Sequence, residues 1–418
     1  MDGMNGNDRR TVAVASFAHG LVHTYELTIP LLIPLWMSSF SADAATIGVV
    51  VTVGYGLFGV GALPSGILAD RYDTRTLIAV SAVGMGAGFG LLALAPNLLV
   101  LTVGLLLWGG AASIYHPTGL SLLSRTVSER GRGLAVHGVA GNLGTAMGPL
   151  AVSVLLADLS WRYVAAFLVV PGVLIGALTL VVHTDQTGRE EVEREDGFRT
   201  DLSMASFLSS SKRLFERGFY VIFLLVVLEG LFYRGVLTFL PDVFETAAGS
   251  GAVFSGLLRD VSGYLYSGLL LVGVVGQYVG GWLVDRTDPV RGLILVFLCL
   301  AAVSTAFATV AADGSWSLVP LSVLLGVFLF GEQPLMQATV ADHSSSDTRG
   351  LSYGYTYAGV FGIGALGATL AGYVLTRASV ASLFAVLATV AVAATVVSAY
   401  LRGRHDGSAN TSVSLFNN

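Results

Sequence analysis

The sequence predicts an all-α membrane protein with many spanning helices, and three observations lead to this fold class. Charged residues make up 12% of the 418-residue chain, about half of the ~25% that is usual in soluble proteins. Hydrophobic residues make up 54%, and the chain contains 52 glycines without a collagen-like period, a composition that suits close-packed membrane helices. The mean hydropathy is +0.75. So few charges cannot cover a soluble surface of this size, so no large soluble domain is expected.

Apolar runs recur along the whole chain, and each is close to the roughly twenty residues that a helix needs to cross a bilayer. Twelve such runs can be counted, so we expect twelve transmembrane helices. The predicted spans are residues 11–37, 45–69, 76–95, 98–124, 132–157, 162–183, 217–241, 258–284, 291–312, 316–341, 350–376 and 379–401.

Lysine and arginine are distributed very unevenly among the predicted loops. With the N-terminus in the cytoplasm, eighteen of the 22 basic residues fall in cytoplasmic loops and tails, and Arg234 falls inside a span. Only Arg162, Arg259 and Arg377 fall outside. Because basic residues are enriched on the cytoplasmic side, both termini are predicted to be cytoplasmic and the protein to lie in the cell membrane.

A polar stretch at residues 184–216 divides the spans into two sets of six. It begins with a Glu-rich charge run and ends with apolar residues around Lys212 and Arg213, which predicts a cytoplasmic linker followed by a short interfacial helix. The predicted domains are therefore an N-terminal six-helix bundle at 1–183, this linker, and a C-terminal bundle with a short cytoplasmic tail at 217–418.

The two halves repeat each other weakly in sequence. Four motifs recur in the same order at offsets of 210 to 217 residues, which predicts a duplicated bundle with pseudo-equivalent halves around a midplane site. The matching pairs are His19-Gly20-Leu21 with Glu229-Gly230-Leu231, Gly66-x-x-x-Asp70-Arg71 with Gly281-x-x-x-Asp285-Arg286, His116-Pro117 with Gln333-Pro334, and Arg132-Gly133-Leu134 with Arg349-Gly350-Leu351.

Over essentially its whole length, the chain resembles the major facilitator superfamily of transporters. Twelve spans in two halves, a central cytoplasmic loop and a Gly-x-x-x-Asp-Arg motif after the second span are typical of that family. The resemblance implies that this motif locks the two halves together in the outward-open state. Asp70 would then accept from a helix N-terminus or from arginines of the facing half. The residues of this gating motif are Gly66, Asp70, Arg71 and Arg75, with Asp285 and Arg286 as the counterpart in the second half.

Two further motifs look like exporters within that superfamily. His116-Pro117 in the fourth span is similar to the fosmidomycin-resistance branch, and the fifth span carries Gly144, Gly148 and Pro149 in a pattern typical of drug/proton antiporters. The glycines permit close approach of helices, and Pro149 is expected to bend the span. The resemblance therefore implies export by proton antiport.

Ionisable side chains within the spans are the candidates for the transport pathway. A charge in a spanning helix costs roughly 2.5–3.5 kcal/mol on insertion scales, so it is retained mainly for function. The ionisable residues deep within the spans lie on the first, fourth, seventh and tenth spans, which line the central cavity in the family that the chain resembles. His137 in the fifth span is a weaker candidate. The candidate pathway residues are His19, His23, Glu26, His116, Glu229, Arg234, Glu332 and its neighbour Gln333.

Helical geometry orders some of these candidates. His19, His23 and Glu26 fall within about 60° of one another around a helix and form one polar stripe. Counting from the cytoplasmic helix ends puts His19, His116 and Glu332 in an inner tier and His23 and Glu229 in a middle tier. Arg234 lies some 140° around the helix from Glu229, so it is expected to pair with Glu26 across the halves or with an anionic substrate.

Several classes of function are excluded by what the sequence lacks. It has no P-loop and no nucleophile–base or metal-ligand motif, so neither ATP-driven transport nor an enzyme is expected. The single cysteine, Cys299, allows neither a disulfide framework nor a thiolate metal site, and we expect no cofactor and no metal. Without a basic cluster interleaved with aromatic residues, nucleic acid is not an expected partner. The expected partners are a small-molecule substrate, protons and the lipid bilayer, and the chain is expected to be monomeric.

The sequence thus predicts a secondary active transporter that moves a small organic molecule by alternating access, with proton-coupled export as the favoured mode. Proton-coupled uptake of an organic anion is the alternative, because Arg234 and several histidines could receive one. A non-transporting membrane sensor on the same fold is a third reading, which would need a partner domain that the chain does not show. The hypothesis of a membrane enzyme has the least support, because the sequence shows no nucleophile–base or metal-ligand set.

Overall fold

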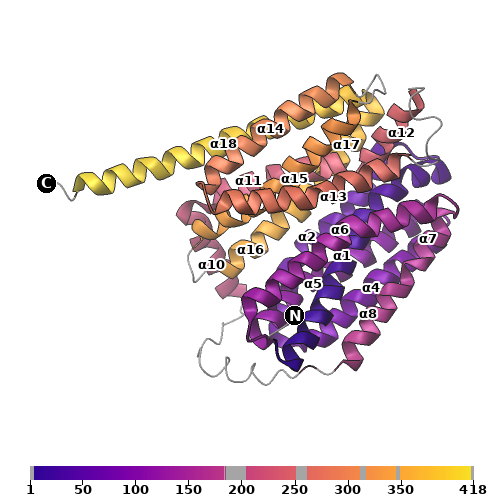
Figure 1. The fold of residues 1–418 in the computed structure, drawn as a ribbon, viewed down its shortest axis with the longest axis horizontal. Coiled ribbons are helices and arrows are strands. Elements are labelled where there is room, and N and C mark those ends of the chain that lie inside the picture. Colours follow the sequence, from indigo (N-terminus) through magenta and orange to yellow (C-terminus); the bar gives the residue numbers. More distant parts are fainter. Residues whose placement is uncertain are drawn as a thin grey trace. The chain divides into compact units, whose positions relative to one another are not determined.

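The structure is a computed structural model that describes residues 4–182, 184, 204–250, 261–310, 317–344 and 349–415. The chain forms two compact units, Met1–Phe207 and Leu208–Asn418, and the boundary falls inside the predicted linker 184–216. Most of that linker, including the charge run at 189–199, lies outside the described residues. Figure 1 shows that the described elements are helices.

The N-terminal unit begins with a long helix and contains several helices that are broken into two segments. Its members pack as α1 against α5 and α6, and α4 against α5, α7 and α8. Its helices are α1 (Gly6–Phe40), α2 (Ala44–Val60), α3 (Ala62–Arg71), α4 (Thr74–Leu94), α5 (Leu98–Thr126), α6 (Arg130–Leu156), α7 (Trp161–Phe167) and α8 (Val169–Val181).

The C-terminal unit has the same kind of helical construction. In it, α13 packs against α15, α14 against α15 and α18, and α11 against α17 and α18. Its helices are α10 (Met204–Leu214), the π-helical turn η1 (Phe215–Phe219), α11 (Tyr220–Leu237), α12 (Leu240–Ser250), α13 (Val261–Val284), α14 (Pro289–Val310), α15 (Leu318–Asp342), α16 (Arg349–Tyr357), the irregular turns η2 (Ala358–Gly362) and η3 (Ile363–Ala365), α17 (Leu366–Arg377) and α18 (Val380–Leu415).

Eleven helical stretches of the described chain are long and apolar enough to cross a membrane. They agree with eleven of the twelve predicted spans to within a few residues, as in Ala44–Arg71 for the predicted 45–69 and Leu351–Arg377 for 350–376. The remaining predicted span, 11–37, lies within α1, which is 35 residues long. Its polar side chains lower its mean hydropathy, but its length is more than a bilayer requires. The predicted twelve-helix membrane fold is confirmed.

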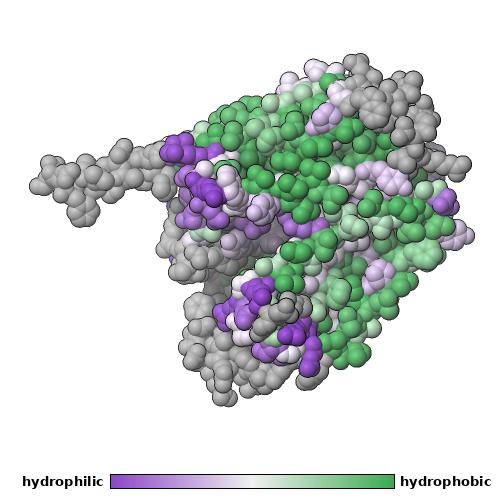
Figure 2. All heavy atoms as spheres, in the orientation of Figure 1, coloured by the Kyte–Doolittle hydropathy of each residue, from purple (hydrophilic) through white to green (hydrophobic). Residues whose placement is uncertain are grey.

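Large apolar side chains cover much of the outer surface of the helices, as lipid contact requires. Figure 2 shows this surface as broad hydrophobic areas. Leu94 and Val181 expose 77% and 81% of their area, which would be costly in water. These exposed apolar side chains suit contact with the hydrocarbon of a bilayer rather than with water.

Glycines let α1 and α6 approach each other within backbone contact. A Cβ atom built on Gly144 would lie 2.0 Å from the carbonyl oxygen of Gly20, and one on Gly148 would lie 2.6 Å from the hydroxyl oxygen of Thr24. Only residues without a side chain fit at such distances. This close contact fixes which side chains of α1 face α6, and so it positions the polar cluster described next.

Candidate functional site

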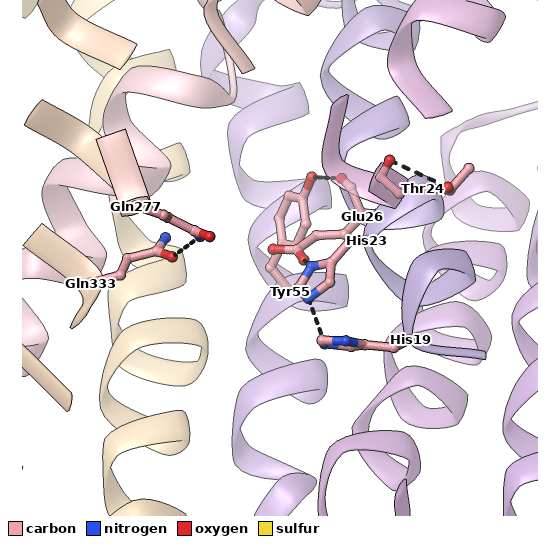
Figure 3. A network of polar contacts seen from close by, with 8 residues as sticks. His19, His23, Thr24, Glu26, Tyr55, Gln277 and Gln333 are labelled. Atoms are coloured by element: carbon pink, nitrogen blue, oxygen red, sulfur yellow. Dashed lines mark hydrogen bonds and ion pairs between the residues drawn. The ribbon is translucent and has the colours of Figure 1, made fainter. Parts of the chain in front are cut away.

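Histidines from three helices converge in the N-terminal unit. The first helix α1 provides His19, His23 and Glu26, while α5 provides His116 and α6 provides His137. The spacing of four between His19 and His23 puts both imidazoles on one face of α1. Figure 3 shows both rings and the Glu26 carboxyl group in this region. The sequence analysis selected all five residues, and the structure brings them together.

A chain of close polar contacts runs along α1 from one residue to the next. His19 Nδ1 donates to the carbonyl oxygen of His137 over 2.8 Å, and His19 Nε2 lies 3.2 Å from His23 Nε2. At the other end, His23 Nδ1 lies 2.9 Å from Glu26 Oε2. Tyr55 donates its hydroxyl proton to the Glu26 carbonyl oxygen over 2.9 Å. Each imidazole of α1 is therefore oriented by a partner at Nδ1.

Ring stacking adds to the order of this cluster. His19 lies flat on His137, with ring centroids 3.9 Å apart and planes 4° from parallel. His116 approaches His19 edge-on at 5.3 Å between centroids, and its ring is tilted to that of His23 at 5.5 Å. The Tyr115 hydroxyl lies 3.0 Å from His137 Nε2 and also donates to the Ala15 carbonyl. The sequence analysis did not select Tyr115, although its position beside His116 on a polar stretch of α5 was a signal.

Burial is nearly complete around the cluster. Glu26 has no exposed area, and His116 and His137 each expose 5%, while the side chain of His23 retains 20% exposure. An ionised carboxylate in such surroundings needs a close positive or donating partner, and His23 is in position to supply one. The predicted pairing of Glu26 with Arg234 would join the two units and stays a prediction.

Two carboxyl groups meet in the C-terminal unit. Glu229 on α11 and Glu332 on α15 are buried, with 7% and 2% exposure, and the two carboxyl groups lie close enough to interact electrostatically. Two neighbouring buried carboxyl groups strongly resist carrying two negative charges. The count from helix ends put these residues in different tiers, but glutamate side chains are long enough to bridge one helical turn.

Polar residues beside this pair are also ordered. The side-chain amide of Gln277 on α13 donates to Gln333 Oε1 over 2.8 Å. Gln277 was missed in the sequence, where its presence in an apolar run was the available signal. Arg234 on α11 is fully buried, and its guanidinium lies 5.2 Å from the Tyr233 ring and 5.4 Å from the Phe361 ring. These rings offer the π faces that a desolvated cation favours.

Comparison with known proteins supplies the family. The sequence model of the Major Facilitator Superfamily matches residues 12–259 and 256–415, nearly the whole chain. The chain belongs to the major facilitator superfamily. Proteins of this superfamily are multi-pass membrane transporters rather than enzymes.

Relatives within the superfamily differ in what they carry. The chain is 30% identical to a 4-hydroxybenzoate transporter of Pseudomonas putida over 371 residues, which cover 81% of this chain and 78% of that protein. It is 29% identical to a multidrug resistance protein B homolog of Mycobacterium tuberculosis over 174 residues, 41% of this chain. The chain spans about a third of that mycobacterial relative's length, since the match covers 32% of it.

Solved structures of other major facilitator proteins have the same fold. A nucleoside transporter aligns with a TM-score of 0.77 at 14% identity, covering 94% of this chain and 99% of the other. The xylose transporter from E. coli aligns with a TM-score of 0.71 at 15% identity, covering 93% and 94%. At these identities the likeness shows the fold alone.

The loop motif of this major facilitator protein links helices within the N-terminal unit. Arg125 of α5 forms a 2.5 Å ion pair with Asp70 at the end of α3. Arg75 near the start of α4 donates to three carbonyls at the end of α8, those of Thr179, Leu180 and Val182, over 2.6 to 3.1 Å. A cation at a helix C-terminus satisfies carbonyls that lack intrahelical partners.

Asp73 has a defined structural role at the start of α4. It is the N-cap of α4, and its carboxylate accepts from the backbone N–H and the hydroxyl of Thr76 over 2.8 and 2.7 Å. Aspartate is among the preferred N-cap residues. In the C-terminal unit, the guanidinium of Arg286 lies 4.3 Å from the Trp282 ring, and among the described residues Asp285 has no ion pair.

Proposed function

We propose that the chain is a secondary active transporter that exports a small organic molecule across the cell membrane by alternating access, in exchange for protons. Both termini would be cytoplasmic and the working form a monomer. The buried Glu229–Glu332 pair carries this proposal, because two neighbouring carboxyl groups buried in predicted membrane spans favour holding a proton. Ionisable groups within membrane spans mark ion and proton pathways in many transporters.

The exchange follows from the chemistry of that pair. Two adjacent buried carboxyl groups strongly resist a second negative charge. Losing the proton therefore requires water or a compensating cation, and regaining it returns the pair to a single negative charge. Coupling arises if the proton-loaded and substrate-loaded forms each favour a different orientation of the protein, since a ligand shifts an equilibrium only by its differential affinity.

Export has a specific rival in proton-coupled uptake of an organic anion. Relatives named for 4-hydroxybenzoate and gentisate, both aromatic carboxylates, match about four-fifths of this chain, whereas the multidrug relatives match 41%. The buried Arg234 guanidinium, flanked by aromatic rings, suits an aromatic carboxylate. Direction of coupling separates the two hypotheses.

The test uses proteoliposomes that contain a pH-sensitive dye and the full-length protein. A panel of aromatic acids and hydrophobic drugs is added outside. In antiport, substrate entry expels protons and the lumen becomes alkaline, whereas in symport the lumen becomes acidic. Acidification that accompanies uptake would replace export by uptake in the proposal, and no substrate-dependent pH change would remove proton coupling.

The variant Glu229→Gln tests the carboxyl pair. Glutamine mimics a permanently protonated carboxyl, so we expect flux driven by a pH gradient to be abolished while substrate binding and substrate–substrate exchange persist. Glu216→Gln is the matched control, because its side chain is 61% exposed and its ion pair with Lys212 is long, at 3.7 Å. Full gradient-driven flux in Glu229→Gln would move the coupling site to Glu332 or Glu26.

A further inference from the structure

The facing Nε2 nitrogens of His19 and His23 lie at hydrogen-bond distance, but the other contacts of both rings leave neither nitrogen with a hydrogen to donate. A backbone carbonyl only accepts hydrogen bonds, so His19 Nδ1, which contacts the His137 carbonyl oxygen, carries a hydrogen. A neutral ring has one N–H, so His19 Nε2 presents a lone pair. The same argument applies to His23, whose Nδ1 contacts the Glu26 carboxyl group. When that group is ionised it accepts, and His23 Nε2 then presents a lone pair as well.

Two lone pairs 3.2 Å apart repel unless a positive centre lies beside them. The distance itself suggests what the centre is. Two imidazole nitrogens bound to one tetrahedral zinc ion at 2.0–2.1 Å are separated by roughly 3.3 Å. The observed separation of 3.2 Å therefore matches the spacing of two ligands on a single metal ion.

A third imidazole lies within reach of the same point. Ligand atoms of His19, His23 and His116 all lie within 4.8 Å of one another. A bridging proton needs only two nitrogens, whereas a metal ion gains from a third. His116 has to move slightly closer to the pair to complete the coordination, and as part of α5 it would join that helix to α1.

The surrounding contacts are those that accompany metal-bound histidines. Such histidines usually donate their other ring N–H to a carboxylate or a backbone carbonyl, which fixes the tautomer and aims the free nitrogen at the metal. His23 contacts the Glu26 carboxyl group and His19 contacts the His137 carbonyl. The His19-x-x-x-His23 spacing also places two ligands on one face of a helix, as in helical zinc sites.

From this geometry we propose that His19, His23 and His116 bind one divalent transition-metal ion of the zinc class, with Glu26 as the residue that orients His23. Imidazole nitrogens favour Zn²⁺, Co²⁺, Ni²⁺ and Cu²⁺, while Mg²⁺ and Ca²⁺ favour oxygen ligands. Three imidazoles leave the fourth tetrahedral position for water or another oxygen ligand. This site lies outside the carboxyl pair that carries the proposed proton coupling.

The test measures metal binding by the purified full-length protein in detergent, carrying an affinity tag that contains no histidine. The protein is stripped with a chelator and titrated with Co²⁺, whose visible absorption distinguishes tetrahedral nitrogen coordination from the octahedral aqua ion. We expect about one Co²⁺ per chain with an intense tetrahedral band, displaced by Zn²⁺ and unaffected by Mg²⁺. A titration that shows only the aqua-ion spectrum overturns the proposal and leaves a proton between the two rings.

Variants locate the site. His19→Gln and His23→Gln are each expected to weaken Zn²⁺ binding more than tenfold, and Glu26→Gln to weaken it by about 10- to 100-fold through loss of the orienting contact. His343→Gln is the control, because His343 lies in the C-terminal unit and its Nδ1 contacts the Thr339 carbonyl of its own helix. Undiminished binding in both His19→Gln and His23→Gln overturns the assignment. The wild-type Co²⁺ spectrum decides the question even if a variant fails to fold.

Discussion

The two halves place different chemistry at equivalent positions. In the N-terminal unit the cluster consists of imidazoles around His19 and His116, whereas in the C-terminal unit carboxyl and amide groups stand at the matching Glu229 and Gln333. The histidines are joined by a chain of close polar contacts, while Glu229 and Glu332 are buried close enough to interact electrostatically. The predicted duplication of the bundle would place one helical frame twice in the chain, with different side chains on each copy.

Backbone contacts preserve that frame in both units. Gly144 packs on Gly20 in the first half, and in the second half a Cβ on Gly364 would lie 2.6 Å from the Cα of Gly230. The partner helix differs, because α6 is continuous whereas the corresponding segment of the second half is interrupted by η2 and η3. Both halves thus share the close glycine contact, but only the first half makes it with an uninterrupted helix.

Topology gives the largest test of the comparison, because its outcome is all or none. If the halves are parallel repeats with cytoplasmic ends, reporters fused at residue 195 and at the C-terminus are cytoplasmic, and one at residue 250 is external. Activity-based reporters in intact cells measure this directly. An external reporter at residue 195 would contradict the twelve-span topology and, with it, the predicted equivalence of the two halves.

Glycine contacts give the next largest effect. Gly144→Ala and Gly230→Ala place a Cβ 2.0 and 2.3 Å from backbone oxygens, so we expect each to destabilise the protein by about 1–3 kcal/mol or more. Thermal unfolding of the purified variants measures the loss. Gly138→Ala and Gly268→Ala are the controls, since an added Cβ meets nothing within 4 Å at either position. Equal stability of Gly144→Ala and Gly138→Ala would contradict the close approach of α1 and α6.

The loop motif gives the smallest and most specific difference. Asp70 pairs with Arg125, but the 217-residue offset puts Asp342 where the second half would need that arginine. We therefore expect Asp70→Asn to lower transport by about an order of magnitude, with substrate affinity within a few-fold, because its ion pair biases conformation rather than binding substrate.

Asp285→Asn is the matched variant, and its transport rate should stay closer to that of the wild type. Initial rates and binding affinities of the two variants, measured in the same proteoliposomes, make the comparison. Equal losses in both would show that the two copies of the motif act alike despite the missing ion pair.

Prediction from the sequence succeeded for the spans, and it selected the ionisable residues that the structure places in clusters. A run of apolar residues is enough to locate a span such as 291–312, and an ionisable residue inside a span is conspicuous. What could not be predicted was which side chains meet. The stacking of His19 on His137 depends on the register of α1 against α6, and that register is set by backbone contacts between residues more than a hundred positions apart. The irregular turns η2 and η3 were likewise not predictable from a proline, because neither contains one.

The space for the His19 ring was made by another residue's lack of a side chain. A Cβ on Gly141 would lie 2.4 Å from a ring carbon of His19, closer than any real contact. Alanine at position 141 would leave no room for this imidazole in its present place. The two positions are therefore coupled, and a substitution at either one alters which residue the other can accept.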